Sequence, residues 1–486
     1  MRDQIKKNLS ILVISDGINR MLVPLLILPY LTRVLGPETY GKYTFALNVA
    51  GFLILLAELD FVLYGIRAVA QNATDAVAIG AKISGIRLVF AATAMSVLVL
   101  YTLIWAPADN QLRLLIFLCG CRMLTDSVNL CWLLIGRSHF QPLAIADILG
   151  RVVFVVFIFL FVKGPSSVWF VPIGTLVGDM VCACIIYYGV FRNFGVVYPR
   201  FSVNDFREVV PTALLLAFAS MMILMVDSVG TVILGYFCPM KEVGLYSATD
   251  RIIIIMLSFH AILSAVFLPI ISESVALNAD DHTDSILYIR ILFFIALPIT
   301  FGGILLAEPI TKFLIGQEYA GSGLIFTLLL PHILACGLAS YYASLKLFAA
   351  NRNREYVVSF SAGAVCNLVL CLIFIPMWGA TAAAVIASLS QFIIVGVAAW
   401  YCRNIDSPSI WGYMIRPLLA CTVMVVLLLL TNAVAPDTHV LLLIVIAAAI
   451  YSLCWYAMGK TVIIRAAEVQ LKNLGSKLGS LMFGSQ

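Results

Sequence analysis

The stretch PLLILPYLTRVLGPETYGKY, residues 24–43, decides how this chain is organised. It ends a first long apolar segment with two prolines and then places Arg33 at the expected edge of a membrane. A Gly-Pro turn follows, and Gly41 and Tyr43 open the next apolar segment. Glycine and proline next to each other mark a turn, and basic or aromatic side chains favour a membrane interface. The stretch therefore predicts a helical hairpin that turns at a membrane surface, with the prolines as expected bend points of its first helix.

The composition of the whole chain also indicates membrane-spanning helices. The 486 residues are 62% hydrophobic and 11% charged, with a mean hydropathy of +1.05. A soluble domain is about 45–50% apolar and about 25% charged. Apolar runs recur from Leu9 almost to the C-terminus, and a helix of about 20 such residues crosses a hydrocarbon core of about 30 Å. We predict an all-α polytopic membrane protein, whose first apolar run is too long for a cleaved signal peptide and is kept as a helix.

The apolar runs predict fourteen transmembrane helices. An even number places both termini on one side, and eighteen Lys and Arg residues fall on that side against six on the other, which assigns it to the cytoplasm. The expected helices are residues 9–32, 42–66, 83–106, 112–135, 143–163, 168–190, 209–236, 245–272, 286–307, 322–345, 356–377, 380–402, 411–434 and 438–459.

The loops between these helices are short, which excludes several functions. None is long enough to form an extramembrane catalytic or nucleotide-binding domain. The phosphate-loop fragment at Gly459 lacks its leading glycine because position 454 is Cys, so an ATPase is not expected. Most of the twelve cysteines lie inside apolar runs, where they are core residues, and we predict no metal site. Residues 460–482 predict an amphipathic helix on the inner leaflet.

A repeat divides the chain into two parts. Thr231–Arg251 (TVILGYFCPMKEVGLYSATDR) resembles residues 32–46 (TRVLGPETYGKYTFA), and the two segments lie six predicted helices apart. Parallel repeats with a site at their interface are typical of transporters. We predict two six-helix lobes in a pseudo-two-fold parallel repeat around a central cavity, at residues 1–200 and 201–405, followed by two further helices at 406–459 and a tail at 460–486.

Polar side chains inside the predicted helices are the candidate site. A charged group at mid-bilayer costs about 2.5–3.5 kcal/mol on insertion scales, so it normally faces a partner or a wet cavity. Asp16/Arg20, Arg122/Asp126 and Asp147/Arg151 are either internal salt bridges or functional groups. The uncharged polar candidates for lining the cavity are Asn19, Asn48, Asn129, Ser220, Asn367 and Gln391.

Two acidic residues are candidates for proton or cation coupling. Asp227 has no basic neighbour one turn away on its helix, so it must be protonated, paired with another helix or wet. Glu58 lies on the polar face of the second helix. His260 and His332 stand alone on apolar helices and are expected to be packing residues.

Four arginines are candidates for binding a diphosphate. Arginine stays charged and can bind a phosphate through two parallel hydrogen bonds. Arg33 and Arg67 could equally be interfacial residues that reach toward the head groups. The set is Arg33, Arg251, Arg20 and Arg67.

Several motifs resemble those of the Wzx-type polysaccharide flippases, within the multidrug/oligosaccharidyl-lipid/polysaccharide exporter superfamily. The resemblance covers most of the chain, is strongest in the first 70 residues and is looser from residue 286 on. One departure is Asp60-Phe61-Val62, where the family often has Asp-Phe-Gly, which leaves the role of that glycine open here. The motifs are Pro29-Tyr-Leu-Thr-Arg-Val-Leu-Gly36 with Tyr40-Gly41-x-Tyr43, Tyr64-Gly-x-Arg67, Gly244-Leu-Tyr246, Gly379-x-x-x-Ala383-Ala384, and Asp250-Arg251 followed by Pro269, the last similar to lipid II flippases.

The resemblance implies a transporter of the bacterial inner membrane that moves undecaprenyl-diphosphate-linked oligosaccharides by alternating access. Arg33 and Arg251 would then contact the diphosphate, with Arg20 and Arg67 as weaker candidates. It implies no cofactor beyond a coupling proton or cation, and no nucleic acid. Membrane lipid, a polysaccharide polymerase and a chain-length regulator are the expected partners. A drug/cation or lipid II exporter of the same fold is the alternative, and a membrane polymerase or acyltransferase is less favoured because the loops are short.

Overall fold

The computed structural model describes a helical protein. Its described backbone covers residues 2–71, 75–104, 109–276, 283–403, 410–434 and 439–458. Side chains are described within these ranges except at residues 2–20, 215–216, 274–276, 411, 432–433 and 458. The predicted tail helix at 460–482 lies outside the described residues.

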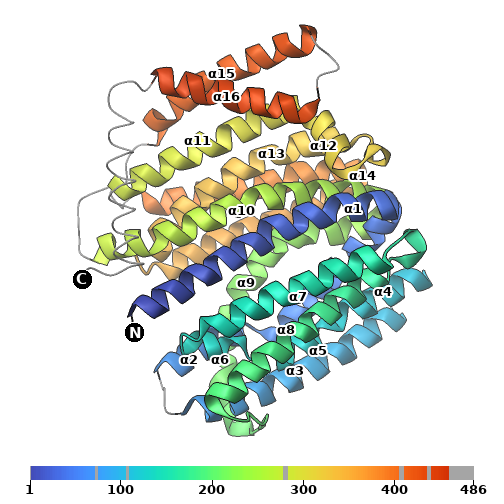
Figure 1. Ribbon diagram of the computed structural model, residues 1–486, viewed down its shortest axis with the longest axis vertical. Coiled ribbons are helices and arrows are strands. Elements are labelled where there is room, and N and C mark those ends of the chain that lie inside the picture. The colour runs from blue at the N-terminus through green and yellow to red at the C-terminus, as the bar shows by residue number, and fades with distance from the viewer. Residues whose placement is uncertain are drawn as a thin grey trace. The chain divides into compact units, whose positions relative to one another are not determined.

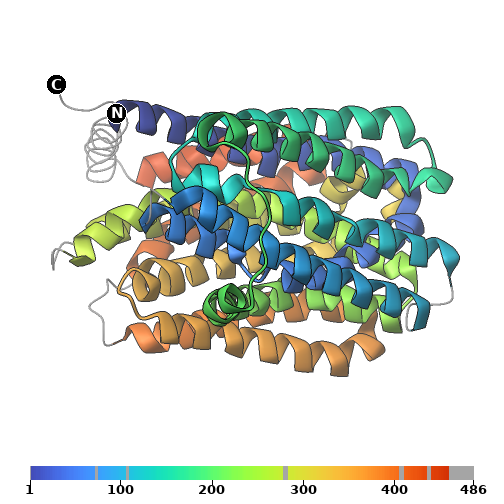
Figure 2. The same ribbon diagram turned by 90° about the horizontal axis from the view of Figure 1, so that it is seen from below.

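The chain forms two compact units, one within Met1–Gly244 and one from Leu245 on. In each unit the helices run side by side as a bundle (Figures 1 and 2). The first unit contains α1 (Arg2–Glu58), α2 (Phe61–Gln71), α3 (Ala76–Ile104), α4 (Asn110–Gly120), α5 (Arg122–Val128), α6 (Cys131–Gly136), α7 (Phe140–Phe161), the short η2 (Pro165–Ser167), α8 (Phe170–Phe194) and α9 (Val203–Phe237).

The second unit contains the rest of the helices. α10 (Met240–Ala276) begins in the first unit and continues into the second. It is followed by α11 (Thr283–Leu305), α12 (Ala307–Ile315), η3 (Gln317–Tyr319), α13 (Ser322–Ala339), the π-helical η4 (Ser340–Phe348), α14 (Asn353–Cys402), α15 (Trp411–Val434) and α16 (Val440–Met458). α15 packs on α11 and on α16 (Figure 1).

α1 is a hairpin of two helices, as residues 24–43 predict. A straight helix of 57 residues would be about 85 Å long, far more than a membrane is thick. Gly36 interrupts it with φ 70° and ψ 168°, a conformation that only glycine adopts without strain. Pro24 and Pro29 lie within helical backbone, and Gly36 is the one non-helical residue of α1. Bending at the two prolines remains a hypothesis.

A second turn separates α1 from α2. Leu59 and Asp60 have positive φ values of 41° and 52°. Val62, which stands where the family often has glycine, is already inside α2 and has no positive φ. The left-handed residues of this turn therefore precede that position, and a glycine is not required there for the backbone to turn.

The predicted helix 112–135 is interrupted twice. It consists of α4, α5 and α6, with breaks at Cys121 and at residues 129–130. Asn129 is extended, with ψ 118°. α4 begins at the cap residue Asp109, whose carboxylate accepts from the Gln111 amide at 2.9 Å.

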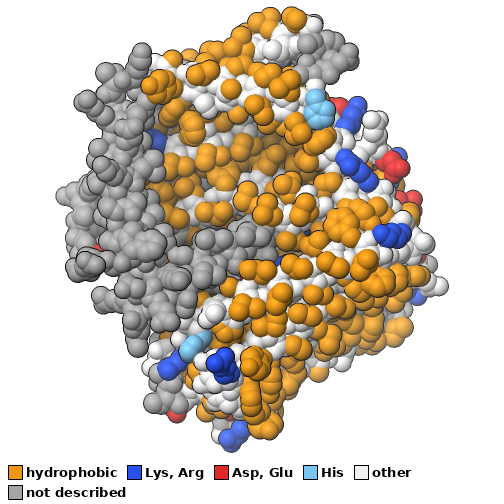
Figure 3. Space-filling model, viewed as in Figure 1, with side chains coloured by type: hydrophobic (Ala, Val, Ile, Leu, Met, Phe, Trp, Pro, Cys, Tyr) orange, Lys and Arg blue, Asp and Glu red, His pale blue; other side chains and the backbone are white. Residues whose placement is uncertain are grey.

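The fourteen predicted crossings agree with the observed helices. Among the described residues, twelve helical spans are long and apolar enough to cross a membrane. Two of them, Met21–Gln71, which includes part of α1 and all of α2, and Asn353–Cys402, are 51 and 50 residues long. Each of those two holds a pair of crossings, because Gly36 and Gly379 (φ 54°, ψ −135°) interrupt their helical backbone. On the face shown in Figure 3, hydrophobic side chains cover most of the described surface and charged side chains lie mainly toward its margins. The all-α polytopic fold is confirmed, and the lobe boundaries remain a prediction.

Candidate functional site

The predicted diphosphate arginines do not all lie in one place. Arg33 is exposed in the last turn before Gly36, and Arg67 is exposed on α2. The second helix of α1 separates them, and its 22 residues from 37 to 58 rise about 33 Å. They therefore lie near opposite ends of the first hairpin, and one phosphate group cannot contact both at once. Arg251 is half-buried on α10, and the side chain of Arg20 lies outside the described residues.

The segment before Arg33 is held to its neighbours by a half-buried hydrogen bond. The Tyr30 hydroxyl donates to the carbonyl oxygen of Val162 at 2.6 Å, next to the end of α7. The Tyr30 ring also packs against Phe159, with centroids 4.5 Å apart. The helix that carries Arg33 is thereby fixed against α7, so the guanidinium projects from a supported backbone.

Among the described side chains of the first unit, the most buried charge is Arg87, which the sequence reasoning missed. Its side chain is 1% exposed. Its guanidinium donates to the carbonyl oxygens of Asn129 at 2.8 Å and Asp126 at 2.5 Å, and lies 3.3 Å from a Glu58 carboxylate oxygen. The two carbonyls belong to the broken end of α5, where helical hydrogen bonding stops. Arg87 therefore satisfies the interrupted backbone of α5 and neutralises Glu58 at the end of α1.

Arg122 forms the centre of a second cluster beside Arg87. Its Nε atom lies 3.4 Å from Asp126 and 3.2 Å from Asp179, so the predicted pair with Asp126 is present and gains a third member from α8. The side chain of Arg122 is 39% exposed, while Asp126 and Asp179 are 18% and 19% exposed. This cluster and the Arg87–Glu58 pair together make a polar region inside an otherwise apolar bundle.

A small polar cavity lies next to this region, between α7 and α8. Asp147, Arg151 and Asp179 line it, and the Cys182 thiol lies 3.9 Å from Asp147. Its volume is about 20 Å³, which is room for a single water molecule. Gly150 and Gly178 bring the two helices close together here, because a Cβ on either would meet the other's carbonyl oxygen within 3 Å. Asp147 and Arg151 thus share a polar cavity with Asp179 of α8.

The other predicted polar residues of the first unit bond mostly to the backbone or to each other. The Ser220 hydroxyl donates to the Asp60 carboxylate, which ties α9 to the turn between α1 and α2. The Asn48 amide donates to the Thr44 carbonyl one turn earlier, at 2.8 Å. The Asn129 side chain accepts from the amide of Cys131, the first residue of α6, at 3.0 Å. Asn19 lies outside the residues whose side chains are described.

Of the two candidates for ion coupling, Glu58 and Asp227 have different surroundings. Glu58 is 31% exposed and paired with Arg87. Asp227 is exposed on α9, inside the candidate membrane span Ala217–Phe237. The described His, Cys, Asp and Glu residues include no group of three that could hold a metal ion.

Most buried polar groups in the described part of the second unit are neutral, but Lys346 is 6% exposed and lies over the Tyr341 ring, 5.7 Å from its centroid. The His260 ring bonds the Ile333 carbonyl at 2.8 Å and His332 the Ala387 carbonyl at 3.3 Å, so both act as packing residues in this structure. The Asn367 amide donates to the Ser390 hydroxyl at 3.1 Å across α14. Gln391, the other predicted polar residue of this unit, is buried.

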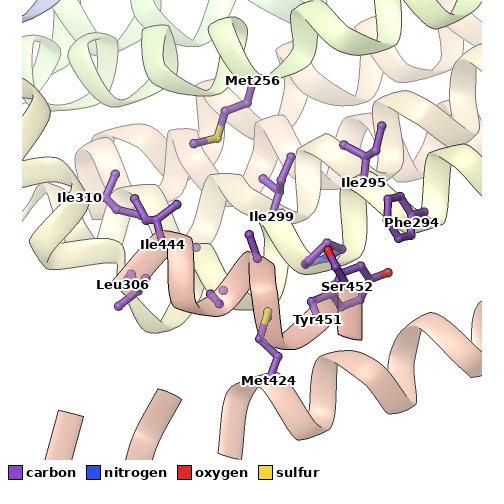
Figure 4. Close-up of a pocket in the computed structure, with 15 residues that line it drawn as sticks. Met256, Phe294, Ile295, Ile299, Leu306, Ile310, Met424, Ile444, Tyr451 and Ser452 are labelled. Atoms are coloured by element: carbon purple, nitrogen blue, oxygen red, sulfur yellow. The ribbon is translucent and has the colours of Figure 1, made fainter. Parts of the chain in front are cut away.

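The second unit also has an apolar pocket of about 330 Å³ where α15 and α16 meet α11. Figure 4 shows Ile299, Ile444 and Met424 around it, with Tyr451 and Ser452 at one side. Lining of this kind fits a hydrocarbon rather than a sugar or a phosphate.

These observations define the class of protein. The many membrane-spanning helices and their breaks beside buried charges fit a membrane transporter. Residues 5–275, more than half of the chain, match the family model described as polysaccharide biosynthesis protein. The chain belongs to this family.

Two curated relatives extend the match along the chain. Both carry the name "Putative O-antigen transporter" and both are 21% identical to this chain. The protein from Escherichia coli strain K12 aligns over 82% of this chain and 97% of its own length, and that from Shigella dysenteriae over 80% and 98%. The similarity therefore extends over nearly the full length of both relatives.

Two solved structures share the fold. The lipid II flippase MurJ, in an inward closed conformation, has a TM-score of 0.63 at 15% identity and covers 90% of this chain and 99% of its own. An inward-facing multidrug resistance MATE family transporter of the MOP superfamily has a TM-score of 0.60 at 17% identity, over 80% and 97%. The family model and the two relatives confirm the predicted polysaccharide-transporter family, and the two solved structures show that the fold is shared.

Proposed function

We propose that this protein is a flippase that moves undecaprenyl-diphosphate-linked oligosaccharide repeat units from the inner to the outer leaflet of the bacterial inner membrane. The observation that carries the proposal is the match to two O-antigen transporter relatives over four-fifths of the chain, on a fold shared with a lipid II flippase. O-antigen, capsule or exopolysaccharide units are the expected glycans. Both termini are expected in the cytoplasm, from the charge bias of the loops.

The arginines support the proposal in a modified form. A diphosphate needs basic groups wherever it leaves the membrane interface, and Arg67 and Arg33 lie near the two ends of one hairpin. In the predicted orientation Arg67 serves the cytoplasmic side and Arg33 the outer side. Alternating access would pass the head group from one to the other, with Arg251 and Arg20 as further contacts. Asn19, Asn48, Asn129 and Ser220 would meet the sugars.

The lipid part of the substrate needs no polar site. It stays in the bilayer, and the apolar pocket beside α11 offers a surface of the right chemistry for a hydrocarbon chain. Asp227 or Glu58 would couple transport to a proton or cation. The polysaccharide polymerase and the chain-length regulator are the protein partners that this role requires.

The test is substitution of the arginines in a strain that depends on this gene for its surface polysaccharide. Arg33→Ala and Arg251→Ala should each abolish surface polysaccharide without lowering the amount of protein, while Arg33→Lys and Arg251→Lys keep part of it. Arg192→Ala, at an exposed position in the last turn of α8, is the matched control. Full surface polysaccharide in both alanine variants would reject the diphosphate role.

Deletion of the gene tests the substrate itself. Lipid-linked repeat units should then accumulate on the inner leaflet, where an added membrane-impermeant glycosidase or lectin cannot reach them in intact spheroplasts. A drug exporter of the same fold would instead leave the glycan unchanged and alter resistance to organic cations.

A further inference from the structure

The two repeated turns meet backbone to backbone. Pro37 begins the second helix of α1, and Met240 begins α10. A Cβ atom on Gly41 would lie 1.9 Å from the carbonyl oxygen of Met240, and one on Gly244 would lie 1.8 Å from the carbonyl oxygen of Pro37. Real Cβ atoms essentially never come within 3.0 Å of another heavy atom, so no other residue fits at either position without moving the helices.

The two contacts are equivalent under the sequence repeat. Gly41 and Gly244 are 203 positions apart, and so are Pro37 and Met240. Each glycine is the fifth residue of its helix and touches the carbonyl of the first residue of the other helix. Reciprocal contacts of this kind are the mark of a two-fold axis, here between two segments of one chain. Close helix crossings at small residues are favoured by van der Waals packing and by weak Cα–H···O contacts.

The surroundings hold the crossing in place. Gly41 and Gly244 are both buried, and Val243 beside Gly244 is fully buried. One turn after Gly41, the Phe45 ring lies over Gly235 of α9 and edge-on to Tyr236, with ring centroids 5.4 Å apart. The crossing also brings two helix N-termini together, whose positive ends repel, and Glu242 in the first turn of α10 offsets this.

We propose that Gly41 and Gly244 form a backbone clasp that stabilises the conformation described here and must separate when the transporter opens on that side. The charge bias of the loops assigns the clasp to the outer side of the membrane. The inference rests on alternating access in the proposed function. Its physical basis is that a methyl group on either glycine keeps the two helices from approaching, so the clasp is closed only by glycine at both positions.

Hydrogen–deuterium exchange of the purified protein in nanodiscs tests the clasp without any substrate. Gly41→Ala and Gly244→Ala should each make amides in residues 37–45 and 240–248 exchange about tenfold faster than in the unsubstituted protein. Gly51→Ala is the matched control, because it lies on the same helix as Gly41 and its Cβ would meet nothing within 4 Å. Unchanged exchange of both segments in the two variants would overturn the clasp, as would an equal effect of Gly51→Ala.

The double variant adds a second measure. Since either alanine opens the same contact, Gly41→Ala combined with Gly244→Ala should exchange little faster than each single variant. If the increases in exchange rate of the two single variants multiply in the double variant, the two glycines act independently and the clasp is rejected.

A photo-cross-linker keeps the proposal testable if the alanine variants fail to fold. Lys241, exposed in the first turn of α10, is replaced by p-benzoylphenylalanine with both glycines intact. Irradiation should join it to a peptide within residues 36–42 and stop the appearance of new surface polysaccharide. No cross-link there, or full transport by the cross-linked protein, would overturn the clasp. Absence of polysaccharide export by the unsubstituted protein would instead reject the proposed function.

Discussion

The two units of this protein stabilise their buried polar groups in different ways. In the first unit, Arg87 and Arg122 join helices that are far apart in the sequence to Glu58, Asp126 and Asp179. In the described part of the second unit, the ion pairs Glu308–Lys312 and Arg352–Glu355 are local, and its buried histidines bond backbone carbonyls.

This difference in how buried polar groups are paired corresponds to the places where the helices of each unit are interrupted. The breaks between α4, α5 and α6 expose backbone carbonyls inside the bundle, and a buried arginine satisfies them. In the second unit the π-helical η4 follows α13 directly, and α14 is interrupted at Gly379, without a buried arginine bonded to either place among the contacts described. Buried charge therefore satisfies the interrupted backbone of the first unit, while Lys346 is buried over an aromatic ring in the second unit and most other buried polar groups described there are neutral.

Of the substitutions considered, Arg87→Ala should lower the stability of the protein most. Arg87→Ala leaves Glu58 and two carbonyl groups without their partner, and removal of one member of a buried pair costs about 3–5 kcal/mol. Thermal unfolding in detergent should show a large fall in Tm, with a smaller fall for Arg87→Lys. The control is Arg67→Ala, which should change stability by no more than about 0.5 kcal/mol because its side chain is exposed. Equal Tm values for Arg87→Ala and Arg67→Ala would contradict the structural role of Arg87.

Substitution of His332 measures how much a buried neutral polar group contributes to the stability of the second unit. His332→Leu removes a long hydrogen bond to the Ala387 carbonyl and keeps an apolar side chain in a buried site, so we expect a cost of about 1 kcal/mol or less. Leu330→Ala, on the same helix and fully buried, should cost about 2–5 kcal/mol through the cavity that it leaves. A larger fall in Tm for His332→Leu than for Leu330→Ala would show that the second unit also depends on a polar contact.

The smallest expected effect is at the surface end of the first unit. The Lys42 ammonium, 2.7 Å from Asp109, holds the pKa of that carboxyl below its ordinary value, with the amides of Gln111 and Leu112 adding to the effect. A lowered pKa means that the pair stabilises the fold above the ordinary value of about 4 and that this contribution is lost as the pH falls through the lower folded value.

Asp109→Asn keeps the helix cap and removes the charge. Because the Asp109 side chain is 37% exposed, the pair should contribute only about 0.2–1 kcal/mol. The Tm of the variant should be slightly lower at pH 7 and should approach that of the unsubstituted protein near pH 3. A difference in Tm that stays constant from pH 7 to pH 3 would show that the charge of Asp109 does not matter.

The helices were predictable because each crossing must be a separate run of apolar residues. The turn at Gly36 was readable from Gly-Pro and the hairpin at Gly379 from its apolar flanks, and both agree with the structure. The two breaks in residues 112–135 were not readable, since no glycine or proline marks residues 129–130. The lone charge at Arg87 inside an apolar run was the signal that could have found them, because an arginine there needs several acceptors.

The sequence by itself determined the membrane-spanning helices, their number, the repeated turns and the family, because a lipid environment leaves only one way to satisfy the backbone of an apolar segment. Only the tertiary structure decided which polar groups meet. It joined Arg87 to a break two helices away, added Asp179 to Arg122 and Asp126, and placed Gly41 against Gly244. These contacts depend on how the helices pack side by side. No local sequence pattern shows which residues from distant parts of the chain will lie next to each other.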